Sequence, residues 1–133
     1  MCDLHALGTA EGIGLRFVDP ARQLAALALG DTARRRAAED TVETILSDPL
    51  RLARITDSTL CHGWAGLLML TRTVAADSPA PARFTPIIQD LHRRLAADWQ
   101  HLSKPGFMEG RAGAQLALNA TDTTGWTRAL LLT

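Results

Sequence analysis

A short glycine motif occurs twice in this chain and limits its fold more than any other feature. Gly63-Trp64-Ala65-Gly66 recurs 47 residues later as Gly110-Arg111-Ala112-Gly113. Each copy stands directly before a mostly apolar stretch, so each is expected to open a helix. A period in this range is typical of helical repeat proteins. The predicted structural turn glycines, which allow close backbone approach, are Gly63, Gly66, Gly110 and Gly113.

Hydrophobic periodicity and helix end signals predict an all-α protein. Strand signals are nearly absent. We expect Gly30-Asp31 to end the first helix and Thr32 to cap the second, so that these two form an antiparallel hairpin. The predicted helices cover residues 21–29, 32–46, 63–76, 83–100 and 112–119.

Two of these helices differ in how their apolar residues are distributed. The 63–76 helix is apolar most of the way round, which predicts burial on more than one side. The 83–100 helix has a single apolar face that includes Ile87, Leu91 and Leu95. Its other face is predicted to be solvated and carries Arg83, Asp90, Arg93, Arg94 and Asp98.

Cys61 and His62 place a thiol beside an imidazole at the start of the first glycine motif. Cysteine and histidine are preferred zinc ligands, and the pair supplies two of the four ligands of a tetrahedral site. Cys2 and His5 could complete a set of two cysteines and two histidines. The alternative is a buried small thiol next to a histidine at a helix start.

Charge and composition exclude some partners. The chain of 133 residues has 14 basic and 14 acidic residues, and no basic tract interleaves with aromatic residues, so nucleic acid is not an expected partner. No apolar stretch approaches the roughly 20 residues that span a bilayer. Two cysteines do not make a disulfide framework, which favours a cytoplasmic location.

Three motifs follow one another in the second half of the chain. They are Leu60-Cys61-His62-Gly63-Trp64-Ala65-Gly66, the segment from Pro105 to Gly113, and Trp126 followed by Leu130-Leu131-Leu132. In this order and spacing they resemble the C-terminal portion of lanthionine synthetase C-like (LanC-type) cyclases. The resemblance covers residues 21–133, which would be part of a LanC-like domain, and leaves residues 1–20 as a divergent segment.

The resemblance implies an α/α toroid of helical hairpins with glycine-rich turns at one end, here as an incomplete ring. It implies a zinc ion held by two cysteines and one histidine, of which Cys61 and His62 match the second cysteine and the histidine. No cysteine stands near Gly12, where the family's first cysteine ligand is expected. The chain is therefore expected to be a truncated or divergent form, and no catalytic acid can be assigned.

The activity implied is thioether formation in lanthipeptide biosynthesis, in which a peptide cysteine adds to dehydroalanine or dehydrobutyrine. The implied partners are a ribosomally made precursor peptide and either a dehydratase or the missing N-terminal part of the cyclase. Contact with a membrane would be peripheral, through a biosynthetic complex. The alternative is a non-catalytic remnant or peptide-binding scaffold, and exposed apolar faces predict self-association.

Overall fold

The computed structural model describes residue 26 and residues 29–119, and the part that it describes is helical with no strand. The expected all-α class is confirmed. The elements are α3 (Thr32–Leu46), α4 (Pro49–Leu52), α5 (Trp64–Asp77), the 3-10 helix η2 (Pro81–Phe84), α6 (Thr85–Asp98), the 3-10 helix η3 (Trp99–His101) and α7 (Arg111–Asn119). Among the described helices, none is long and apolar enough to cross a membrane.

The start of α3 follows the predicted turn but has a different cap. Gly30 has a φ of 67°, a left-handed conformation that glycine adopts without strain. Asp31, not Thr32, is the N-cap, because its side chain accepts a hydrogen bond from the Arg34 N–H at 3.0 Å. Thr32 is the first helical residue, so the prediction of its capping role was wrong. Apart from Ala26, which is helical, the expected 21–29 helix and its hairpin lie outside the described residues.

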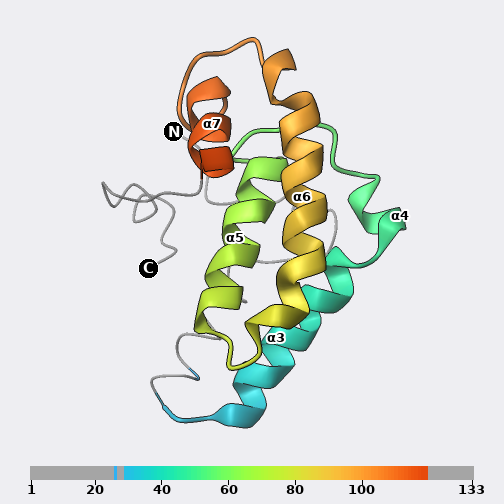
Figure 1. Cartoon of the computed structure of the whole chain (residues 1–133), viewed down its shortest axis with the longest axis vertical. Coiled ribbons are helices and arrows are strands. Elements are labelled where there is room, and N and C mark those ends of the chain that lie inside the picture. Colours follow the sequence, from blue (N-terminus) through green and yellow to red (C-terminus); the bar gives the residue numbers. More distant parts are fainter. Residues whose placement is uncertain (1–25, 27–28, 120–133) are drawn as a thin grey trace.

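The α5 and α6 helices lie side by side and make the central pair of the structure (Figure 1). Buried residues cover most of the circumference of α5, as its sequence predicted. Burial on α6 is limited to one face, on which Ile87, Leu91 and Leu95 are buried. These observations confirm the different burial expected for the two helices.

One arginine joins α3 to the segment before α6. The Arg83 guanidinium contacts the carboxylates of Glu39, Asp40 and Glu43, all on α3. Hydrogen bonds to Asp40 and Glu43 raise the pKa of Arg83. Its side chain is 25% exposed, so Arg83 belongs to an interface between elements and not to the solvated face on which it was predicted.

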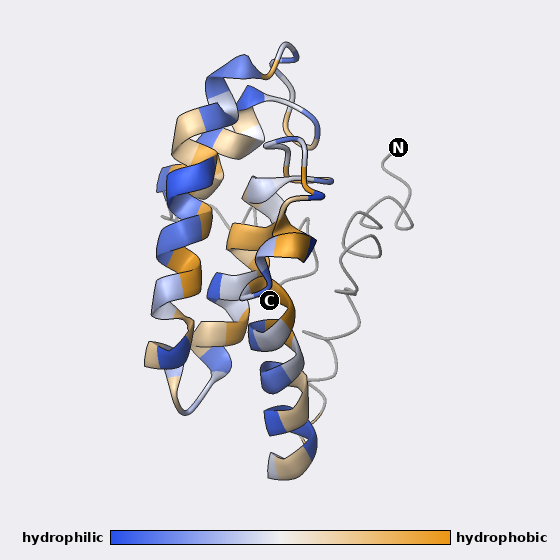
Figure 2. Ribbon diagram, turned by 90° about the vertical axis from the view of Figure 1, so that its right-hand side faces the viewer, coloured by the Kyte–Doolittle hydropathy of each residue, from blue (hydrophilic) through white to orange (hydrophobic). Residues whose placement is uncertain are grey.

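A single hydrophobic cluster connects the described helices. It contains buried residues of α3, α4, α5, α6 and α7 and of the segment before α5. In Figure 2 the hydrophobic residues gather toward the middle of the helix group, and hydrophilic residues lie toward its outside. The glycine motifs therefore open two helices, α5 and α7, that share one core.

Candidate metal centre

The two glycine motifs form turns that share a backbone hydrogen bond at the start of the helix. We name residues 57–66 the first turn and residues 104–113 the second turn. The N–H of Trp64 donates to the Asp57 carbonyl at 3.1 Å, and the N–H of Arg111 donates to the Lys104 carbonyl at 2.9 Å. Both pairs are seven residues apart, and each donor is the first residue of its helix. The repeat seen in the sequence is thus also a repeat of structure.

Each of the four motif glycines lies against the carbonyl oxygen of the residue six positions earlier. A Cβ atom added at these glycines would meet that oxygen at 1.9–2.6 Å, closer than real Cβ contacts allow. The pairs are Gly63 with Asp57, Gly66 with Leu60, Gly110 with Lys104, and Gly113 with Phe107. The close approach accounts for glycine at all four positions.

The two turns contact each other directly at Cys61. The N–H of Cys61 donates to the carbonyl of Met108, at 3.0 Å. A Cβ at Gly113 would lie 2.6 Å from the Leu60 side chain, so α7 begins against the residue that precedes Cys61. Figure 1 shows α7 beside the N-terminal end of α5. The second turn, which carries no cysteine or histidine, supports the first.

Hydrogen bonds from one threonine fix the backbone within the first turn. The Thr59 hydroxyl donates to Asp57 Oδ1 at 2.8 Å and accepts from the N–H of His62 at 3.0 Å. The N–H of Thr59 donates to the same Asp57 oxygen at 2.7 Å. Neither Asp57 nor Thr59 was predicted to be a site residue, although aspartate followed by small hydroxyl residues is a signal for this kind of turn.

The α6 helix holds the first turn from another side. The buried Ser58 hydroxyl donates to Asp98 Oδ2 at 2.7 Å. The Arg94 guanidinium lies over the Trp64 ring at 5.0 Å from its centroid, a cation–π distance. Trp64 is 7% exposed, so its ring packs in the interior.

The predicted ligand pair lies in this fixed turn. Cys61 is 2% exposed and its sulfur is in a disulfide, whereas His62 is half-buried. A zinc ligand must be a thiolate, so any zinc site at Cys61 requires the reduced chain. Cys2 and His5 lie outside the described residues. Whether they complete a site stays a prediction.

The number of donors is smaller than a zinc site needs. Within residues 29–119, no group of three or more histidine, cysteine or acidic residues is placed to hold a metal ion. A catalytic zinc site has three protein ligands and one open position. A thiolate and an imidazole are donors that zinc prefers, so Cys61 and His62 fit zinc chemically. The described residues supply only these two donors.

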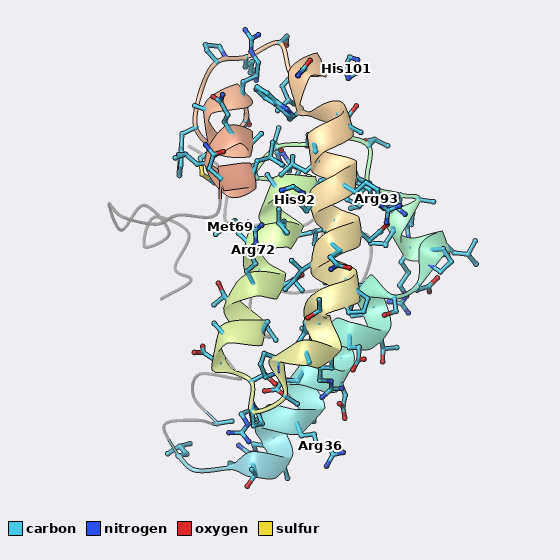
Figure 3. The ribbon with its side chains drawn as sticks, viewed as in Figure 1. Arg36, Met69, Arg72, His92, Arg93 and His101 are labelled. Carbon is cyan, nitrogen blue, oxygen red and sulfur yellow. The ribbon has the colours of Figure 1, made fainter. Side chains whose placement is uncertain are left out.

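Three further titratable residues are candidate site residues by type: one lies in the second turn, and two lie on α6 and η3. Glu109 of the second turn accepts a hydrogen bond from Lys104 Nζ at 2.7 Å, and Lys104, with a smaller contribution from the charge of His62, lowers the pKa of Glu109. Figure 3 shows His92 on α6 and His101 at the end of η3. The His101 side chain is 79% exposed and pairs with Asp98, so it lies at the surface.

Comparison with known proteins identifies the family. The family model described as lanthionine synthetase C-like protein matches residues 18–131. No curated protein and no solved structure matches the chain. The matched range includes both glycine-rich turns, and with the first turn the Cys61-His62 pair. The chain belongs to the lanthionine synthetase C-like family.

Proposed function

We propose that this chain acts as a LanC-type cyclase on a ribosomally made precursor peptide. Membership of the family supports a cyclase-type function. The single observation that carries the proposal is the position of Cys61 and His62. Both lie in a turn that glycine packing, a threonine hydroxyl and the neighbouring turn hold in one conformation. Two adjacent donors in a fixed backbone suit a preorganised metal centre.

The proposed reaction is the addition of a peptide thiolate to a dehydrated residue. The sulfur forms a bond to the β-carbon of dehydroalanine or dehydrobutyrine, and the electron pair of the carbon–carbon double bond moves toward the carbonyl. The resulting enolate takes a proton at the α-carbon, so the step needs no oxidant or reductant. Zinc, when bound, would lower the pKa of a cysteine thiol. The role assigned to Cys61 and His62 is to act as two of its ligands.

Zinc content of the reduced chain tests this proposal. We expect about one zinc per chain after dialysis with a thiol-free reductant. Cys61→Ala and His62→Ala should each lose it, because each removes a donor. His101→Ala is the matched control, since His101 is exposed and lies outside both turns, and the zinc content of this variant should not change. Absence of zinc from the wild-type chain would overturn the zinc-dependent reaction.

A non-catalytic peptide-binding scaffold is the second candidate function. It is favoured by the small number of donors, because the described residues supply only two of the three protein ligands of a catalytic zinc site. A synthetic peptide with one cysteine and one dehydroalanine distinguishes the two functions. Cyclisation does not change the peptide's mass, so turnover is followed as loss of the free thiol. Binding without thiol loss supports the scaffold.

The other predicted partners are part of the same proposal. A separate dehydratase, or a further part of the cyclase, would supply or receive the dehydrated peptide. Self-association also stays a prediction. Within the described part of the chain, Leu29 and Leu50 are the strongly exposed large apolar residues, at 77% and 80%. Sedimentation velocity at two protein concentrations tests for self-association.

A further inference from the structure

We propose that Thr59 is a positioning residue for His62. The role of His62 as a metal ligand rests on the proposed function, but the positioning of its backbone does not. The Thr59 hydroxyl is 2.8 Å from Asp57 Oδ1 and 3.0 Å from the amide nitrogen of His62. Thr59 is 5% exposed, so water has little access to compete for these bonds.

The direction of the two hydrogen bonds explains why a hydroxyl is required. An ionised carboxylate only accepts hydrogen bonds, so the Thr59 hydrogen points to Asp57. A lone pair of the same oxygen is then directed to the N–H of His62. The hydroxyl therefore links the Asp57 carboxylate to the backbone amide of His62 and restricts the position of that amide. A methyl group in its place would leave the amide without this acceptor.

Asp57 is itself held in place, so it can serve as the fixed end of this connection. Its Oδ1 also accepts from the N–H of Thr59, and its carbonyl accepts from the N–H of Trp64. The carboxylate and the carbonyl both lie against Gly63, where a Cβ would be 2.2–2.3 Å from their oxygens. Movement of Asp57 would therefore disturb the start of α5. The Thr59 hydroxyl, which donates to Asp57, is held in one position as a result.

Three variants test the role of the hydroxyl. Thr59→Val keeps the shape of the side chain and removes the hydroxyl, whereas Thr59→Ser keeps the hydroxyl. Thr71→Val is the matched control, because Thr71 is also buried and its hydroxyl donates only to the Leu67 carbonyl within α5. Urea unfolding of each variant measures the change in global stability, which is subtracted before the local effects are compared.

Amide hydrogen exchange of His62 is the first measurement, and it requires no metal. We expect Thr59→Val to accelerate this exchange about fivefold beyond the change in global stability, since the His62 amide loses a buried hydrogen-bond acceptor. Thr59→Ser should restore slow exchange, and Thr71→Val should leave it unchanged. Equal exchange rates at His62 in Thr59→Val and wild type would overturn the proposal.

Cobalt binding to the reduced chain is the second measurement. Thr59→Val should weaken cobalt affinity about tenfold and shift the visible d–d spectrum, as loss of groups that orient ligands does at metal sites. Thr59→Ser should restore both. If the wild-type chain binds no cobalt while Thr59→Val alters His62 exchange, the proposed metal chemistry fails and the positioning role stands. Cobalt bound with equal affinity and spectrum in Thr59→Val and wild type would overturn the positioning of His62 as a ligand.

Discussion

At the scale of single residues, Gly113 and Gly106 offer a matched pair for testing the second turn. A Cβ at Gly113 would overlap the Phe107 carbonyl and the Leu60 side chain, whereas a Cβ at Gly106 has no atom within 4 Å. We expect Gly113→Ala to reduce the free energy of unfolding by about 2 kcal/mol, as overpacking does. Gly106→Ala should change it by less than about 0.5 kcal/mol. Urea unfolding monitored by circular dichroism measures both.

The donors of the candidate site could be proposed from the sequence, but the residues that support them could not. Cys61 and His62 could be found because thiol and imidazole are distinctive in type and adjacent in sequence. The role of Thr59 could not, because a hydroxyl bonds to whatever backbone group the turn brings near it. The contact of Cys61 with Met108 depends on how two distant turns meet. Sequence spacing predicted that the turns are alike but not that they contact each other.

At the scale of secondary structure elements, the connection between α3 and the start of α6 depends on Arg83. Arg83→Met should lower the free energy of unfolding by about 2 kcal/mol, because it removes a cation from the buried carboxylate of Glu39. Arg93→Met is the control, since Arg93 is 75% exposed and pairs with Asp90 on the same helix. It should cost less than about 0.5 kcal/mol. Equal losses in the two variants, measured by urea unfolding, would contradict the role of Arg83.

The helices themselves were largely predictable from periodicity. The predicted 32–46, 63–76 and 112–119 helices agree with α3, α5 and α7 to within about one residue. The 83–100 helix is divided into η2, α6 and η3, and periodicity alone does not distinguish a 3-10 turn at a helix end. The four-residue helix α4 was missed, because it is too short to show a period.

At the scale of the whole molecule, the sequence predicted repeated helices but not how they are connected. The apolar residues that cover most of α5 required neighbours on several sides, and the structure supplies α6 and α7 among them. Which residues cross between elements depends on tertiary packing. Arg83 was predicted to be solvated because a charge on the polar side of a helix usually faces water. The sequence of the predicted 83–100 helix alone could not predict that Arg83 lies beside three carboxylates of α3.

The single core makes a last prediction about cooperativity. Leu68 of α5 has no exposed surface, and its cluster includes residues of every described α-helix. Leu68→Ala should therefore reduce the free energy of unfolding by about 3 kcal/mol. Leu50→Ala is the control, because Leu50 is 80% exposed, and should change it by less than about 0.5 kcal/mol. Tryptophan fluorescence and far-ultraviolet circular dichroism should give the same urea midpoint for Leu68→Ala, since one core unfolds as a unit. Separate midpoints would mean that the helices on either side of α5 unfold independently.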